Sequence, residues 1–169
     1  MPARKDSRKA RPPKATRPHM PGYGLSRSRA GLLPWKWAAD RLKRSHNYWI
    51  VTTRPNGAPH AMPVWGLWVN DRFFFSTGRQ SRKTRNLAVN PRCVVCNERA
   101  EEAVIVEGTA SEVTDDSLLE RLSPLYHRKY RPWKLDPGLG PIYEVRPRTV
   151  FGIAERTFPR RATRWEFEA

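Results

Sequence analysis

The residues best suited to chemistry lie in a basic segment that starts at Ser81 and reads Ser-Arg-Lys-Thr-Arg-Asn-Leu. Serine is a preferred helix N-cap, so the segment predicts a short helix over residues 81–89. A helix N-terminus carries positive partial charge, and Arg82, Lys83 and Arg85 would repel it and one another unless an anion binds there. The cations, the hydroxyl groups of Ser81 and Thr84 and the free backbone N–H groups together predict a phosphate site. Charge alone leaves a second interpretation open, namely a solvated basic face on a very basic protein.

Three runs rich in β-branched and aromatic residues precede this helix, at 48–53, 60–69 and 73–77. Asn-Gly follows the first run and Asn-Asp the second, and such pairs suit tight hairpin turns. The runs therefore predict an antiparallel meander that leads into the basic helix.

The second run contains two residues that weaken an ordinary strand. Pro63 lacks a backbone donor, which predicts a sheet edge or a bulge at this point. Gly66 has no side chain, so a ligand or another backbone can approach closely. Trp65 and Trp68 are three residues apart, which puts them on opposite faces. We expect one of them to fill the interior and the other to reach a cofactor or a partner subunit.

The order of these pieces resembles a known family. The motifs follow one another in this order: a strand, an Asn-Gly turn, Pro-His-x-x-Pro-Val, Phe-Phe-Ser-Thr-Gly and then Ser-Arg-Lys-x-x-Asn-Leu-x-x-Asn-Pro. In this order the chain resembles the pyridoxamine 5′-phosphate oxidase-like family of flavin-binding split β-barrels. The chain is most similar to the actinobacterial branch of flavin and deazaflavin oxidoreductases, over about residues 35–169 and most densely over 46–91. Thr163-Arg164-Trp165 matches a C-terminal pattern of that branch.

The resemblance implies a mainly β fold, a six- to seven-stranded antiparallel split β-barrel of Greek-key type with a few short helices. It implies FMN as cofactor, with the deazaflavin coenzyme F-420 as the alternative. Arg82 and Lys83 would hold the cofactor phosphate, Ser76 and Thr77 would lie near the ribityl chain or the phosphate, and the backbone of 62–67 would run along the isoalloxazine ring. The implied cofactor-binding residues are Met62, Pro63, Val64, Trp65, Gly66, Leu67, Ser76, Thr77, Ser81, Arg82 and Lys83.

The implied activity is a flavin- or deazaflavin-dependent oxidoreductase that transfers hydride to or from a small organic substrate. The cofactor carries that chemistry itself, so no catalytic side chain is required, and none is identified. Candidate residues of the substrate pocket are His60, Tyr130 and Trp133, although a structural hydrogen bond is the more ordinary role for His60. We expect a homodimer with the cofactor at the subunit interface, since seven tryptophans suit an apolar interface.

The chain departs from a true pyridoxamine-phosphate oxidase. No Arg-Leu-His sequence stands near its C-terminus, no second phosphate site emerges, and Ala103 replaces a cofactor-contacting Gln. Oxidation of vitamin B6 is therefore not expected. Two alternatives remain from other classes: a flavin-binding or carrier protein without turnover, and a basic nucleic-acid-binding protein, because the net charge is +16.

Cys93 and Cys96 suggest a metal or redox site, but the run in which they occur reads as a strand. Positions i and i+3 of a strand point to opposite faces, so the thiols neither chelate one ion nor bridge easily. We expect structural cysteines and no metal. No Gly-x-Gly-x-x-Gly is present either, which argues against a Rossmann dinucleotide site.

The flanking segments predict the rest of the fold. Helices are expected at 35–45 and 115–130, the latter kinked or divided by Pro124. A long strand over 103–113 should bend at Gly108, and further strands are expected at 142–146, 149–154 and 162–167. Together these strands would close a barrel with no free edge.

Residues 1–34 carry nine Lys or Arg and one Asp, which is half of the net charge. This basic, Pro- and Arg-rich tail is too poor in apolar residues to fold alone and is expected to be disordered before about residue 30, ahead of a flavin-binding domain over 35–169. It could hold anionic polymers or lipid headgroups, although an extension without a role is favoured. No membrane span or signal peptide is evident, so a cytoplasmic location is expected.

Overall fold

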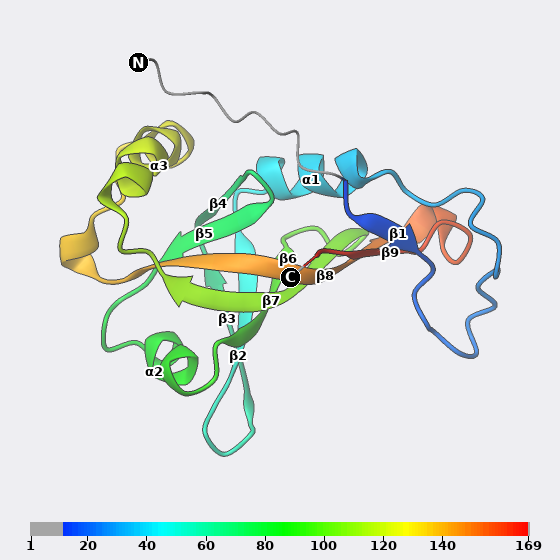
Figure 1. The fold of residues 1–169 in the computed structure, drawn as a ribbon, viewed down its shortest axis with the longest axis horizontal. Coiled ribbons are helices and arrows are strands. Elements are labelled where there is room, and N and C mark those ends of the chain that lie inside the picture. The colour runs from blue at the N-terminus through cyan, green and yellow to red at the C-terminus, as the bar shows by residue number, and fades with distance from the viewer. Residues whose placement is uncertain (1–11, 169) are drawn as a thin grey trace.

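The computed structural model describes residues 12–168, which form a nine-stranded antiparallel sheet with three α-helices (Figure 1). Two single-turn 3-10 helices lie at Pro137–Leu139 and Glu155–Thr157. The α-helices are α1 (Trp35–Arg44), α2 (Arg82–Val89) and α3 (Asp116–Lys129). The strands are β1 (Lys14–Thr16), β2 (Tyr48–Thr53), β3 (Pro59–Val64), β4 (Gly66–Val69), β5 (Arg72–Ser76), β6 (Arg92–Asn97), β7 (Glu102–Glu112), β8 (Ile142–Ala154) and β9 (Thr163–Glu166).

The sheet is a split barrel that is not closed. Its hydrogen-bonded order is β1-β9-β8-β7-β6-β2-β3, and β8 also pairs with β5, which pairs with β4. The expected strand over 60–69 is broken at Trp65, and its halves take different partners: β3 pairs with β2, and β4 with β5. No ladder joins β3 to β4 among the described residues, so the expectation of a barrel without a free edge was wrong. Pro63 lies in β3, at the end of the sheet order, as its missing donor predicts.

The break coincides with a point where two strands touch. A Cβ atom on Gly66 would lie 2.3 Å from Cζ of Phe73 and 2.7 Å from the carbonyl oxygen of Phe74. Only glycine fits there, because these atoms belong to the neighbouring strand β5 and cannot retreat. The close approach that Gly66 permits is therefore made by the chain itself.

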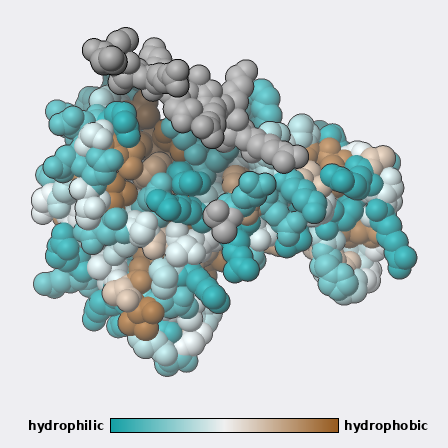
Figure 2. Space-filling view, viewed as in Figure 1, coloured by the Kyte–Doolittle hydropathy of each residue, from teal (hydrophilic) through white to brown (hydrophobic). Residues whose placement is uncertain are grey.

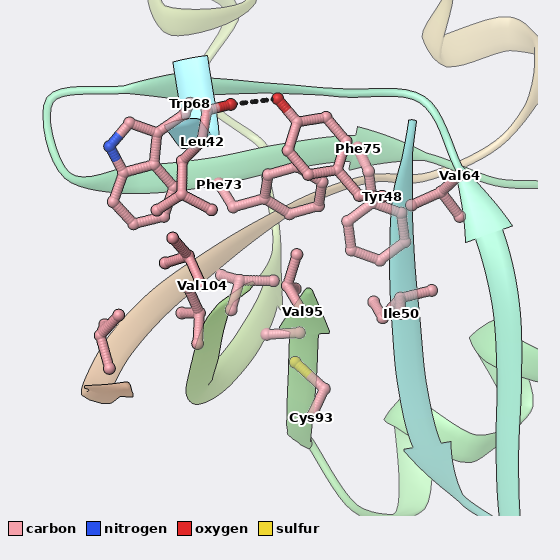
Figure 3. Packing of buried hydrophobic residues seen from close by; sticks show 14 of the residues in the cluster. Leu42, Tyr48, Ile50, Val64, Trp68, Phe73, Phe75, Cys93, Val95 and Val104 are labelled. Atoms are coloured by element: carbon pink, nitrogen blue, oxygen red, sulfur yellow. Dashed lines mark hydrogen bonds between the residues drawn. The ribbon is translucent and has the colours of Figure 1, made fainter. Parts of the chain in front are cut away.

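The interior of the barrel is apolar, and strands β2 to β9 all contribute buried side chains to it (Figure 3). In β2, Tyr48, Ile50 and Thr52 are buried and alternate with more exposed residues, as a strand with one face on a core requires. Trp68 is 4 % exposed and Trp65 is 37 % exposed, which confirms that the two lie on opposite faces. Helix α1 covers one end of the barrel with Ala38, Ala39 and Leu42.

A second apolar cluster lies under α3, on the outer side of β4 and β5. Its buried members are Leu67, Phe74, Leu122, Tyr126, Tyr130, Leu135 and Ile142. Figure 2 shows hydrophilic residues over most of the visible face, with apolar surface beside α3.

Two interruptions predicted from the sequence are absent: the division of the helix at Pro124 and the gap between the strands at 142–146 and 149–154. Helix α3 continues through Pro124, which is exposed, so the carbonyl group that loses its partner faces the solvent side. The strands expected at 142–146 and 149–154 are one strand, β8, because a register shift between Glu107 and Gly108 of β7 absorbs the irregularity opposite Pro147.

The expectation of disorder before about residue 30 does not hold for residues 12–34. Strand β1 pairs with β9, and the guanidinium group of Arg17 donates to the carbonyl oxygens of Ser28 at 2.9 Å and Ala162 at 3.1 Å. The prediction rested on amino-acid composition. Composition does not show that β9 offers an edge for β1 or that Arg17 finds backbone carbonyl groups to bind. The first eleven residues of the predicted tail lie outside the described part of the chain. Within the described part, no helix has the length and apolar character needed to cross a membrane.

Candidate functional site

The turn from β5 into α2 is held by a chain of hydroxyl groups. Thr77 Oγ1 donates to Ser81 Oγ at 3.1 Å, and Ser81 Oγ lies 3.2 Å from Thr84 Oγ1, which donates to the carbonyl oxygen of Gly78 at 2.9 Å. Ser81 is the N-cap, as predicted, and accepts from the backbone N–H of Thr84 at 3.2 Å. The hydroxyl protons are therefore used within the turn, where they fix the start of the helix.

The backbone donors of the first turn remain available. Within residues 12–168, the N–H groups of Arg82 and Lys83 have no acceptor. Because helix N–H groups and the helix dipole both favour negative charge, this end of α2 can receive an anion.

Lys83 is the informative cation of the pair. Its side chain is half-buried, and burial lowers the pKa of its amine. Arg82 is exposed, and neither residue makes an ion pair with a carboxylate in the described part of the chain. The neighbouring Arg79, by contrast, lies 3.9 Å from Glu112. A cation that is taken out of water without a counter-ion lowers stability, so Lys83 is better explained by a ligand than by packing.

His60 belongs to the same cluster. It is the cross-strand partner of Thr52, and Asn86 of α2 donates to Thr52 Oγ1 at 2.9 Å, so α2 sits against this pair. Burial lowers the pKa of His60, and the nearby charges of Arg54, Lys83 and Arg82 lower it further. Its Nδ1 atom is buried, and so is Oδ1 of Asn86, and neither has a hydrogen-bond partner among residues 12–168.

The segment 62–67, assigned by resemblance to the isoalloxazine ring, divides into two parts. Met62, Pro63 and Trp65 are exposed, with fractional exposures of 41 % for Met62 and 37 % for Trp65. The other three residues, Val64, Gly66 and Leu67, are buried. A hollow of about 330 Å³ is lined by Asn47, Pro63, Val64 and Trp65. The exposed residues and the free edge of β3 thus offer an apolar surface with backbone hydrogen-bonding groups.

Ser76 ends β5 and Thr77 follows it. Both line a second hollow of about 180 Å³, together with Gly78, Lys134, Asp136, Leu139 and Gly140. This hollow is next in sequence to the basic end of α2, which is consistent with a place beside a phosphate or ribityl group.

The three candidate substrate residues do not form one pocket. His60 lies beside α2, as described above. Tyr130 is 2 % exposed, and its ring is stacked under Trp65 with centroids 4.8 Å apart. Trp65 therefore covers this ring, and a contact of Tyr130 with substrate stays a prediction. Trp133 is 59 % exposed, and its backbone N–H donates to the carbonyl oxygen of Tyr130 at 2.9 Å.

Sequence reasoning missed Arg54, Asn86 and Lys129. The first two reach the cluster only through the register of β2 with β3 and the packing of α2 on Thr52. The sequence contained one usable signal, the Asn86 position of the Asn-Leu-x-x-Asn-Pro pattern.

The cysteines are placed as predicted. Cys93 is buried and Cys96 is half-exposed, on opposite faces of β6, and both are free thiols. Burial raises the pKa of both thiols, to about 12 for Cys93. No group of three or more metal-ligating side chains occurs in the described residues.

Comparison with known proteins places the chain. Among solved structures, General Stress Protein 26 from Bacillus anthracis str. Sterne matches with a TM-score of 0.58 and 22 % identity, over 70 % of this chain and 92 % of that one. An F420 Reductase matches with a TM-score of 0.54 and 20 % identity, over 66 % and 93 %. An FAD-binding protein from Mesorhizobium loti matches with a TM-score of 0.56 and 14 % identity, over 78 % and 94 %.

These likenesses show the fold. No curated protein sequence gives a significant match. The family described as "Pyridoxamine 5'-phosphate oxidase" matches residues 36–155, which is more than half of the chain. The chain therefore belongs to the pyridoxamine 5′-phosphate oxidase family.

Proposed function

We propose that the protein is a flavin- or deazaflavin-dependent oxidoreductase, with FMN as cofactor and coenzyme F-420 as the alternative. The observation that carries the proposal is the half-buried Lys83 at the N-terminus of α2, which makes no ion pair with a carboxylate among the described residues. Its charge, with those of Arg82 and Arg54, acts on His60. A cofactor phosphate would supply the missing negative charge. Two fold relatives, an F420 reductase and an FAD-binding protein, point to the same cofactor class.

Each part of the site has a role in this proposal. Arg82, Lys83 and the free N–H groups of α2 bind the phosphate. Ser76 and Thr77 flank the ribityl chain, and the exposed residues Met62, Pro63 and Trp65, with the free edge of β3, lie against the ring. The bound cofactor supplies the hydride chemistry, while the protein supplies orientation, charge and a surface that excludes water.

A homodimer is part of the proposal, and the outer face of the sheet supports it. The register places Pro63, Trp49, Cys96, Ile105 and Phe151 side by side across five strands, from β3 to β8. All of them are at least partly exposed, and Trp49 is 48 % exposed. A continuous apolar row of this kind is typical of a surface that another chain covers. The row ends at Pro63, so a second copy seated on it would adjoin the ring surface.

The test is cofactor binding by the purified protein. Titration with FMN and with coenzyme F-420, followed by cofactor fluorescence, should show saturable binding of one or both. Lys83→Ala should weaken that binding, whereas Arg79→Ala should not, because Arg79 already lies near Glu112. Binding that is equal in all three proteins would overturn the phosphate assignment.

A carrier without turnover is the second candidate, because no catalytic side chain is identified among the described residues. The two functions separate when the reduced cofactor is loaded anaerobically and challenged with electron acceptors. An enzyme re-oxidises the cofactor faster than free cofactor in solution does, whereas a carrier protects it.

A further inference from the structure

Two residues at the C-terminal end of α3 form hydrogen bonds with Gly66, the first residue of β4 after the break that separates it from β3. Lys129 Nζ donates to the carbonyl oxygen of Gly66 at 2.9 Å and to the hydroxyl of Tyr48 at 2.8 Å. The hydroxyl of Tyr130 accepts from the N–H of Gly66 at 2.9 Å and lies 2.9 Å from its carbonyl oxygen. Both polar backbone atoms of a single residue are therefore bound by two consecutive side chains that lie more than sixty residues away in sequence.

Gly66 is also fixed from the other side. The ring of Phe73 and the carbonyl oxygen of Phe74 fill the space where a side chain would be, as described for the fold. The residue before it, Trp65, stacks on Tyr130 with an angle of 9° between the rings. The position of the exposed Trp65 ring is thus set by Tyr130 beneath it and by the backbone that Lys129 and Tyr130 hold.

Burial of the charged Lys129 amine in this contact lowers the stability of the folded protein. Lys129 is half-buried, with its Nζ 4.7 Å from the ring centroid of Tyr48 and 5.2 Å from that of Tyr130. It makes no ion pair in the described part of the chain. The nearest carboxylate with an influence on it, Glu98, is bonded to the N–H groups of His46 at 2.9 Å and Asn47 at 3.0 Å. An apolar residue would fill this space at a lower cost in stability, which argues that the position of the backbone matters.

We propose that Lys129 and Tyr130 are positioning residues, which hold Gly66 and Trp65 in the geometry that receives the isoalloxazine ring. This inference rests on the proposed function. The two residues act through the backbone and need not touch the cofactor. Lys83 and Arg82 then bind the phosphate of the cofactor, while Lys129 and Tyr130 fix the position of the backbone that lies against its ring.

The test compares Lys129→Met and Tyr130→Phe with Lys43→Met, in which the replaced lysine is exposed on α1. Hydrogen exchange of residues 62–67 is measured in the protein without cofactor. Lys129→Met loses one hydrogen bond to Gly66 and Tyr130→Phe loses two, so exchange of these amides should speed up by about tenfold or more in the first two variants and stay unchanged in the third. Exchange that is unchanged, or faster throughout the chain to the same degree, would overturn the positioning role.

Riboflavin and FMN then separate the two ends of the site. Riboflavin has the ring but no phosphate, so Lys129→Met should weaken binding of both compounds several-fold, whereas Lys83→Ala should weaken only FMN. Unchanged riboflavin binding in Lys129→Met would overturn the inference and leave the proposed function standing. If the unaltered protein binds neither compound and does not bind coenzyme F-420 either, the proposed function fails and the cofactor role of Lys129 fails with it, while the exchange result still decides whether Lys129 and Tyr130 hold Gly66.

Discussion

Lys83 lies close enough to His60 to lower its pKa, although the two residues come from different elements, α2 and β3. The charges of Arg82 and Arg54 act on the same imidazole. Cations around an imidazole favour its uncharged form, and a bound anion would act in the opposite direction.

The first prediction concerns Lys83. We expect Lys83→Ala to weaken FMN binding at least tenfold, because a charge-assisted hydrogen bond to phosphate contributes on the order of 1.5–3 kcal/mol. The protein without cofactor should be as stable as before or slightly more stable, since the lost amine was half-buried without an ion pair. Fluorescence titration and thermal unfolding measure the two effects. Arg82→Ala should also lose FMN affinity, and Arg85→Ala, which removes an exposed charge of the same helix, should have much less effect.

The second prediction concerns pH. Without ligand the pKa of His60 is below its usual value, so its imidazole is uncharged at neutral pH. A bound phosphate raises that pKa, and binding therefore takes up a proton and becomes tighter as pH falls through the range below about 6.5. In the same range the unfolded protein binds more protons at this position, so the contribution of His60 to stability is lost as pH falls. His60→Gln should flatten the pH dependence of FMN affinity, and an identical slope in both proteins would contradict the prediction. The titration of FMN itself is common to both and cancels.

The third prediction uses Lys129, whose pKa is lowered to about 8, chiefly by burial. Between about 8 and the ordinary lysine value near 10.5, the unfolded chain binds more protons at this position than the folded chain. The free energy of unfolding should therefore rise with pH across this window and level off below it, by on the order of 1–2 kcal/mol after allowance for partial exposure. Burial raises the pKa of Tyr48 and Tyr130, so their hydroxyl groups stay protonated meanwhile.

Denaturant titrations of the unaltered protein and Lys129→Met at several pH values measure this slope. The free energy of unfolding of the unaltered protein minus that of Lys129→Met should increase with pH, because other lysines titrate alike in both. A difference that is constant with pH would mean that the amine has an ordinary pKa in the folded protein.

The local features of the fold were predictable where the signal was local. Ser81 caps α2, Trp65 and Trp68 face opposite ways, and Cys93 and Cys96 are separated by β6, all of which follow from residue type and a period of two or 3.6. The grouping of Arg54 and His60 with α2 was not predictable, because it depends on the register of a hairpin.

The same reason explains why the burial of Tyr130 was not predicted. Its position in an aromatic and basic segment suggests a ligand contact, yet its hydroxyl lies 2.7 Å from the carbonyl oxygen of His46 and its ring is covered by Trp65. Contacts across more than sixty residues decide that burial, and one sequence contains no record of them. The break at Trp65 is of this kind too, since it depends on the closeness of Gly66 to Phe73 of the next strand.

The last prediction concerns assembly. Trp49 belongs to the apolar row on the outer face, opposite Pro63 on one side and Cys96 on the other. If a second copy covers this row, Trp49→Glu places a charge in an apolar interface, and the dimer should dissociate at micromolar concentration. Light scattering and sedimentation velocity measure the change. Trp133→Glu is the matched control, because Trp133 is 59 % exposed, lies beyond the end of α3 and is not part of the row, so the assembly should be unaffected. Since the row ends beside the ring surface, Trp49→Glu should also weaken flavin binding in step with dissociation. A protein that is monomeric with flavin fully bound would contradict both the dimer and a cofactor site shared between subunits.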